Sequence, residues 1–279
     1  MANKIFSIYS NENYQPEESD HLIIETGNNH ICLVVKSRAE NVNALEWFTY
    51  TDEENQNLDN LFREFVDVSA LLGKTYASTT LFINNDCNVL IPSAFFKADL
   101  IDDYLYAALG ECFGYSTGYD RFPDSKGPVN VYRFKTSTTN YIKDRFEISQ
   151  TQHTYSRLLE KWLLLKNKPD VLMNIIFYEG FFLLAVFEKG ALQIMHAFPY
   201  QVAEDVVYHW LNLVKQLGLN SNELIIRISG VIDIPSALHS MLLKYFKNVT
   251  IETIQLGKIN LTCNQYPLHY FTPLFNLAI

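Results

Sequence analysis

The sequence predicts an α/β protein in which one structural unit occurs twice, giving two lobes. From Val171 to Ile254, the apolar residues follow the spacing of three short strands, a helix, a strand, a second helix and a last strand. A weaker copy of most of this order runs from Leu22 to Pro92. The same order of elements twice in one chain indicates a structural duplication.

The second copy has the clearer pattern. Two predicted strands, Leu172 to Phe177 and Phe181 to Phe187, flank the turn Tyr178-Glu179-Gly180, and Ala191 to Phe198 forms a third. An apolar stripe at helical spacing follows, and Gly218 is expected to cap this helix at its C-terminus. The elements expected after it are a buried strand at Glu223 to Ser229, a helix capped by Asp233, and a closing strand at Thr250 to Ile254.

The first copy repeats this order with different turn lengths. A helix is expected from Leu58 to Leu72, and Gly73 is its expected C-cap. The predicted strands are Leu22 to Ile24, Ile31 to Val35, Ala44 to Tyr50 and Thr80 to Asn84. The matching segments are Leu22 to Val35 with Leu172 to Phe187, Ala44-Leu45 with Ala191-Leu192, Leu72-Gly73 with Leu217-Gly218, and Thr80 to Asn84 with Leu224 to Ile228.

These patterns divide the chain into three parts. Residues 1–20 are predicted to be a polar arm that pairs loosely with the body, 21–165 the first lobe, and 166–279 the second. Between Gly114 and Pro128 the chain is dense in Gly, Ser, Asp and Pro, which predicts a loop and a subdomain boundary. An insertion is therefore expected around residues 114–146.

Composition limits the classes of protein to which the chain can belong. The 279 residues are 48% hydrophobic and 14% aromatic, which supports a large core. A net charge of -9 offers no broad basic surface, so we expect no nucleic-acid partner. The N-terminus does not resemble a secretory signal, and apolar runs such as Phe181 to Phe187 are far shorter than the roughly 20 residues of a membrane span. A cytoplasmic protein without membrane association is predicted.

Metal-binding and catalytic motifs are not evident in the sequence. Cys32, Cys87, Cys112 and Cys263 form no CxxC pair and have no histidine at a familiar metal-ligand spacing, so they are expected to be buried free thiols in a reducing compartment. The seven histidines show no His-x-x-His or Glu-x-x-His spacing, and no metal site is predicted. No GxSxG element, Walker loop or GxGxxG follows a strand, and no catalytic residue is assigned.

Two segments resemble a known family. The stretch ELIIRISGVIDIPSAL and the ending YPLHYFTPLFNLA are similar to the domain-of-unknown-function family 3822, whose members resemble the actin-like ATPase superfamily. That superfamily includes sugar kinases, chaperone ATPases, FtsA and PilM, and the plan is nearest to FtsA and PilM. The resemblance implies a duplicated actin-like, or ribonuclease H-like, fold in which each lobe has a mixed sheet and flanking helices.

The resemblance also implies a nucleotide between the two lobes. Its phosphates and Mg²⁺ would lie at two DxG-type turns, and its adenosine at a Gly-rich turn, because glycines let backbone N–H groups approach phosphate oxygens. The corresponding residues here are Glu25, Thr26 and Gly27, then Glu179 and Gly180, and finally Ser229 and Gly230.

Each of these turns departs from the superfamily pattern. Glu25 stands where Asp is expected, Tyr178 occupies the acidic position of the second turn, and the adenosine turn has one glycine and then Val231. Ordinary hairpin turns also use polar residues and glycine, and this interpretation is favoured for Glu25 to Gly27 and for Gly180. At Ser229-Gly230, ligand contact and close backbone packing are both open.

Two functions from different classes follow. The first is an actin-like protein without ATPase chemistry, an interaction or assembly scaffold that binds an unidentified protein partner through the interlobe cleft or the insertion and needs no cofactor. The alternative is a nucleotide-binding protein, a kinase or slow ATPase that uses ATP and Mg²⁺ at the residues named above. A third hypothesis is a membrane-associated module that uses the apolar segment from Tyr266 to Ile279.

Overall fold

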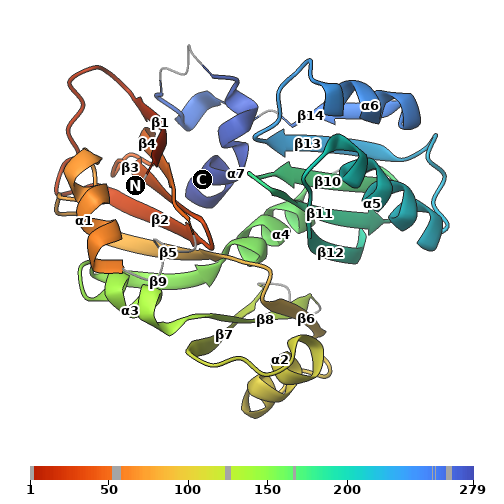
Figure 1. The fold of residues 1–279 in the computed structure, drawn as a ribbon, viewed down its shortest axis with the longest axis horizontal. Coiled ribbons are helices and arrows are strands. Elements are labelled where there is room, and N and C mark those ends of the chain that lie inside the picture. Colours follow the sequence, from red (N-terminus) through yellow and green to blue (C-terminus); the bar gives the residue numbers. More distant parts are fainter. Residues whose placement is uncertain are drawn as a thin grey trace. The chain divides into compact units, whose positions relative to one another are not determined.

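A computed structural model describes residues 3–51, 58–122, 127–165, 168–252, 254, 256–261 and 266–279. The chain divides into two units (Figure 1). Unit 1 comprises Met1–Glu160, Leu256–Thr262 and Leu277–Ile279, and unit 2 comprises Lys161–Gln255 and Cys263–Asn276. Among the described residues, no helix combines the length and the apolar content that crossing a membrane requires.

Unit 1 is built on a six-stranded sheet with the order β1-β4-β3-β2-β5-β9. Its strands are β1 (Asn3–Tyr9), β2 (His21–Gly27), β3 (His30–Lys36), β4 (Val42–Thr49), β5 (Ser78–Asn84) and β9 (Ile148–His153). The strands β1 to β4 pair antiparallel, whereas β5 pairs parallel with β2 and β9 pairs parallel with β5. The carboxyl ends of β2, β5 and β9 therefore lie at one edge of the sheet.

Unit 2 contains a five-stranded sheet with the order β12-β11-β10-β13-β14. Its strands are β10 (Val171–Phe177), β11 (Phe181–Glu188), β12 (Ala191–Pro199), β13 (Ile225–Gly230) and β14 (Asn248–Ile251). The first three pair antiparallel, and β13 and β14 continue the sheet in parallel.

The predicted duplication is confirmed by the pairing of strands in the two sheets. Leu22 pairs with Val35 and with Thr79 in unit 1, and Leu172 pairs with Phe187 and with Ile225 in unit 2. Each sheet also has a register shift where the third strand joins the second, at Val35/Lys36 and at Val186/Phe187. Each unit is thus built on a mixed sheet, and the order β4-β3-β2-β5 of unit 1 matches the order β12-β11-β10-β13 of unit 2.

Helices cover one face of each sheet. In unit 1, α1 (Leu58–Val68) and α3 (Thr136–Lys143) pack on side chains of β2, β3 and β5, and in unit 2, α5 (Ala203–Gln216) and α6 (Ala237–Tyr245) pack on β10, β11 and β13. Phe65 of α1 and Trp210 of α5 are fully buried in these two cores. Each unit therefore has its own hydrophobic core. Burying one large apolar side chain in such a core stabilises the fold by about 1.5–3 kcal/mol.

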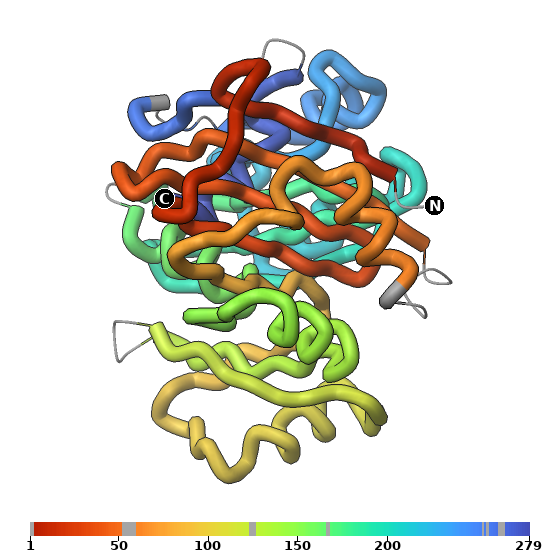
Figure 2. Tube along the Cα trace, turned by 90° about the vertical axis from the view of Figure 1, so that its left-hand side faces the viewer, coloured from red at the N-terminus to blue at the C-terminus, as the bar shows by residue number. Residues whose placement is uncertain are grey.

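The largest difference between the units is the segment between β5 and β9. It contains β6 (Asn88–Pro92), η2 (Ala98–Leu100), α2 (Ile101–Leu109), β7 (Tyr115–Arg121) and β8 (Pro128–Lys135), and it forms a small sheet in the order β6-β8-β7. Figure 2 shows this segment, in yellow, gathered beside the main sheet of the same unit. In unit 2 the connection between β13 and β14 holds α6 alone.

One prediction about this region was wrong, and one strand next to it was not predicted. The loop expected between Gly114 and Pro128 contains β7, which pairs along its whole length with β8. As an edge strand of a small sheet, β7 is held by backbone hydrogen bonds and needs no apolar alternation. The strand β9 was also missed, because Ile148–His153 is mostly polar.

Several element ends also differ from expectation. Residues Asn3–Tyr9, expected in a loosely paired arm, form β1 with Phe6 and Ile8 buried. The helix α1 ends at Val68 instead of at Gly73, because the buried carboxylate of Glu46 accepts hydrogen bonds from the Ser69 hydroxyl and, at 3.0 Å, from the Ala70 backbone N–H. Gly218 ends α5 as expected: it directly follows the C-cap residue Leu217 and has the left-handed φ of +65°.

The helix α6 begins later than predicted. Its N-cap is Ser236, whose hydroxyl accepts a hydrogen bond from the backbone N–H of His239 at 3.1 Å. Asp233, the predicted cap, instead accepts a hydrogen bond from the hydroxyl of Tyr270. That tyrosine belongs to η4 (Leu268–Phe271), which packs against β13.

The remaining elements are α4 (Thr154–Leu164), η3 (Leu256–Lys258) and α7 (Thr272–Ala278).

Three large apolar side chains of the C-terminal segment, Phe271, Leu274 and Phe275, are fully buried, so these side chains offer no apolar surface to a membrane. The cysteines Cys32, Cys87 and Cys112 are free thiols. The expected burial is confirmed for Cys32 and was wrong for the half-buried Cys87 and the exposed Cys112, while Cys263 lies outside the described residues.

A buried histidine joins the inserted segment to the main sheet of unit 1. His153, at the end of β9, donates its backbone N–H to Asp120 of β7 at 2.8 Å. Its ring nitrogen Nδ1 accepts the backbone N–H of Tyr155 at 3.1 Å, so Nε2 carries the proton and faces Asn85 Oδ1 at 3.4 Å. Because its ring is fully buried, desolvation lowers the pKa of His153 to about 3.

This histidine makes stability depend on pH. Since the folded-state pKa of about 3 lies below the ordinary value of 6.5, protons bind preferentially to the unfolded chain. The contribution of neutral His153 is complete above pH 6.5 and declines as the pH falls toward 3, by on the order of 4 kcal/mol. In urea unfolding at a series of pH values, His153→Gln should show a shallower loss of stability over this range than the wild type.

The control for this prediction is His196→Gln, which removes an exposed histidine of β12 and should keep the wild-type slope. Equal slopes for the wild type and His153→Gln would contradict the neutral, buried state of His153.

Candidate functional site

The carboxylate of Glu25 lies inside the protein, at the carboxyl edge of the unit 1 sheet. Its side chain is 1% exposed, and its Oε1 accepts hydrogen bonds from Asn84 Nδ2 at 3.0 Å and from Thr154 Oγ1 at 2.8 Å. Asn84 ends β5 and Thr154 begins α4 directly after β9, so the parallel pairing of the strands brings these three side chains together. Glu25 is therefore part of an internal polar network.

Gly27 makes room for a histidine ring. A Cβ atom at Gly27 would lie 2.1 Å from Cε1 of His30, which no side chain could tolerate. The carbonyl oxygen of Gly27 accepts a hydrogen bond from the Tyr50 hydroxyl at 2.7 Å, and Nε2 of His30 lies 3.7 Å from Oε2 of Glu25. The glycine in this turn is thus required by packing inside unit 1.

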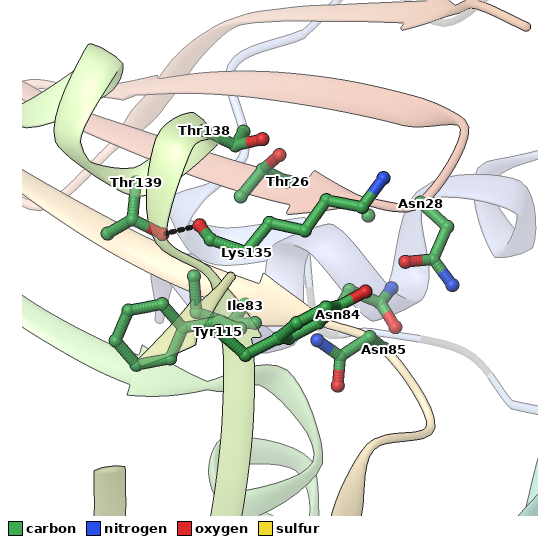
Figure 3. A pocket seen from close by; sticks show the side chains of 11 residues that line it. Thr26, Asn28, Ile83, Asn84, Asn85, Tyr115, Lys135, Thr138 and Thr139 are labelled. Atoms are coloured by element: carbon green, nitrogen blue, oxygen red, sulfur yellow. Dashed lines mark hydrogen bonds between the residues drawn. The ribbon is translucent and has the colours of Figure 1, made fainter. Parts of the chain in front are cut away.

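A small pocket with a mixed polar and apolar lining adjoins the turn (Figure 3). It has a volume of about 30 Å³, enough for one or two water molecules. Lys135 extends across the pocket toward Asn28, and the Thr139 hydroxyl donates to the Lys135 carbonyl oxygen at 3.1 Å. Its lining residues are Thr26, Gly27, Asn28, Ile83, Asn84, Asn85, Tyr115, Phe134, Lys135, Thr138 and Thr139. A lysine beside the first turn of α3 suits a small anion.

The second predicted turn is a tight hairpin. The backbone N–H of Tyr178 donates to Phe181 at 2.9 Å, and Gly180 has a φ of +81° with open space around it. The ring of Tyr178 is 1% exposed and stacks on Phe181 with ring centroids 4.7 Å apart. Glu179 is exposed at the tip. A buried aromatic ring therefore occupies the position where the superfamily pattern has its acid.

The third predicted motif is held by packing at the end of β13. Ser229 is fully buried and donates its hydroxyl to Glu252 Oε2 at 3.1 Å, and burial raises the pKa of Glu252. Gly230 has a φ of +84°, and a Cβ atom there would lie 2.1 Å from the carbonyl oxygen of Phe177. Close approach to β10 thus accounts for this glycine.

The structure groups the predicted residues by unit. Glu25, Thr26 and Gly27 meet in unit 1, and the hairpin of Gly180 and the end of β13 at Gly230 are both attached to β10 in unit 2. Five residues that surround the first group were not predicted from the sequence: Asn84, Thr154, Lys135, His30 and Cys32. The order of parallel strands would have been needed to find Asn84 and Thr154. His30 and Cys32 could have been found, because residues i and i+2 of a strand share a face.

Comparison with known proteins identifies the family. The profile of the family described as "Protein of unknown function (DUF3822)" matches residues 10–249. The chain belongs to DUF3822. No curated protein matches this DUF3822 chain.

Solved structures confirm the actin-like fold of this DUF3822 protein. One is a Bacteroides thetaiotaomicron protein with an actin-like ATPase fold and unknown function, with a TM-score of 0.76 and 16% identity over 94% of this chain and 96% of that one. Another is a chain of the PilM–PilN type IV pilus biogenesis complex, with a TM-score of 0.58 and 11% identity over 94% of this chain and 97% of that one. The expected resemblance to PilM in plan is therefore confirmed at the level of the fold.

Gly180 and Gly230, two of the positive-φ glycines of unit 2, give a testable contrast. Gly180→Ala should cost about 1–2 kcal/mol, because the left-handed conformation is strained but the space is open. Gly230→Ala should cost about 1–3 kcal/mol more, because its new methyl group also meets the Phe177 backbone. Urea unfolding of both variants measures the difference, and equal losses would show that the close approach at Gly230 is unimportant.

Proposed function

We propose that this DUF3822 protein is an interaction scaffold with an actin-like fold and without ATPase chemistry. The observation that carries the proposal is the burial of Glu25, whose carboxylate is enclosed by Asn84 and Thr154 and is not presented to a solvated Mg²⁺ ion. The packing roles of Gly27 and Gly230 support the same conclusion, because each glycine is explained by a contact within its own unit.

A polar groove on unit 1 is the proposed binding surface for a partner. It has a volume of about 630 Å³ and lies on the face of the sheet opposite α1, with Thr80, Gln150 and Gln152 as its floor. The ring of His21 is held there by the hydroxyls of Ser78 at 2.6 Å and Thr80 at 3.0 Å.

Charged residues border this groove. Lys36 forms an ion pair with Glu40 at 2.9 Å, and Arg157 forms one with Glu160 at 3.2 Å. Arg121 of β7 also lines the groove, so the inserted segment contributes to it. A surface of amides, hydroxyls and both charges suits an extended polar segment of another protein. The PilM–PilN complex supports a role in assembly, since a chain of similar fold there belongs to a multiprotein complex.

The partner prediction can be tested by charge reversal. Arg121→Glu should lower the recovery of a specific partner from the native cell by about tenfold, equivalent to ~1.4 kcal/mol of binding free energy. The matched control is Arg63→Glu on the exposed side of α1, which should recover the partner as the wild type does. Equal recovery with Arg121→Glu would place the partner elsewhere.

Nucleotide binding, with kinase or slow ATPase activity, is the second candidate function. The observation that favours it is the pocket lined by Lys135, Thr138 and Thr139, because an ammonium group and two hydroxyls can all donate hydrogen bonds to phosphate oxygens. There a phosphate group would meet a lysine and the first turn of α3.

Calorimetric titration with ATP and Mg²⁺ separates the two functions. The scaffold proposal predicts no binding up to millimolar nucleotide. Micromolar binding that is lost in Lys135→Ala and kept in Lys143→Ala would overturn it, since Lys143 is an exposed lysine at the other end of α3. Gly230 is unsuitable for this test because its substitution disturbs the packing on Phe177.

A further inference from the structure

Three side chains with metal-binding atoms meet inside unit 1. The carboxylate of Glu25, the imidazole of His30 and the thiol of Cys32 have ligand atoms that all lie within 4.8 Å of one another, and all three residues are buried. Their exposed fractions are 1%, 3% and 1%, so the group is shielded from solvent on every side.

The β2–β3 hairpin explains why these residues converge. Glu25 and Cys32 are register partners across the hairpin, which places their side chains on the same face of the sheet. His30 precedes Cys32 by two residues on β3 and shares that face. The apolar side chains of Ile24 and Ile31 point to the opposite face, into the core under α1.

The hydrogen bonds of the imidazole direct one nitrogen at the carboxylate. Nδ1 of His30 lies 3.3 Å from Asn29 Oδ1, an oxygen that can only accept, so Nδ1 carries a proton. In the neutral ring, the lone pair of Nε2 then faces Glu25 Oε2 at 3.7 Å. A metal ion between these two atoms would be coordinated by both of them.

The surrounding residues resemble the outer shell of a metal centre. Oε1 of Glu25 is hydrogen-bonded to Asn84 and Thr154, whereas Oε2 accepts no hydrogen bond within the described part of the chain. Ligating histidines usually donate their second ring N–H to an oxygen, as His30 does to Asn29, and ligating carboxylates are themselves hydrogen-bonded. Gly27 below the ring fixes the place of the imidazole.

We propose that Glu25, His30 and Cys32 bind a divalent transition-metal ion of the Zn²⁺ class. One carboxylate oxygen, one imidazole nitrogen and one thiolate are ligands that Zn²⁺ accepts, and a thiolate disfavours Mg²⁺ and Ca²⁺. The metal would clamp the turn between β2 and β3. This site is independent of the scaffold function, because it lies within one unit and needs no partner.

Metal titration of the full-length protein tests the proposal. Protein stripped of metal should bind one Zn²⁺ per chain, and Co²⁺ in its place should show thiolate-to-metal charge-transfer absorption. Cys32→Ala should abolish that absorption and weaken Zn²⁺ binding by about 100-fold or more. Cys87→Ala, which removes a half-buried thiol elsewhere in unit 1, should leave both unchanged.

A second variant leaves all three ligands in place. Thr154→Val keeps the side-chain shape but removes the hydrogen bond to Glu25, so Zn²⁺ affinity should fall by about 10- to 100-fold. The Co²⁺ spectrum of the wild type decides the question even if Cys32→Ala does not fold. Absence of Zn²⁺ binding at micromolar metal, or Co²⁺ absorption without thiolate character, would overturn the proposal.

Discussion

The parallel pairing of β2 with β5 in unit 1, and of β10 with β13 in unit 2, is the constraint on which the rest of the structure depends. In unit 1 it places Gly27 beside Asn84, and in unit 2 it places Phe177 beside Gly230. Because parallel strands end at the same edge, polar residues that are distant in the sequence meet there. The buried network around Glu25 and the close approach at Gly230 both follow from this pairing.

Burial changes the role of residues in motifs that resemble nucleotide-binding turns. When an acid and a glycine of a hairpin face solvent, they can bind a phosphate and its metal ion. When a neighbouring ring covers them, they instead take part in packing and hydrogen bonding inside the protein. In this protein the His30 ring covers Gly27, and Asn84 and Thr154 enclose Glu25. A sequence pattern alone does not separate the two situations, because the covering residues come from two different strands and one helix.

Much of the fold could be predicted because the apolar periodicity is local. The strands β10 to β13 and the helix α5 follow from spacing and from glycines such as Gly218. Elements stabilised by distant partners could not be predicted in this way. The polar strands β7 and β9 are held by backbone pairing, and α1 ends where Glu46 of β4 accepts a hydrogen bond from the Ala70 backbone. The candidate site was found at Glu25 to Gly27 but not at Asn84 and Thr154, for the same reason.

The inserted segment between β5 and β9 shows where this fold can accept additional elements. The main sheet is complete whether the connection is one helix, as between β13 and β14, or a whole small sheet with its own helix. Lengthening a connection adds little loop-closure entropy, since that cost rises only logarithmically with length. For a gene that arose by duplication, this connection is the position where one copy can acquire a new module while both hydrophobic cores are preserved, and it is the natural place to graft a reporter domain.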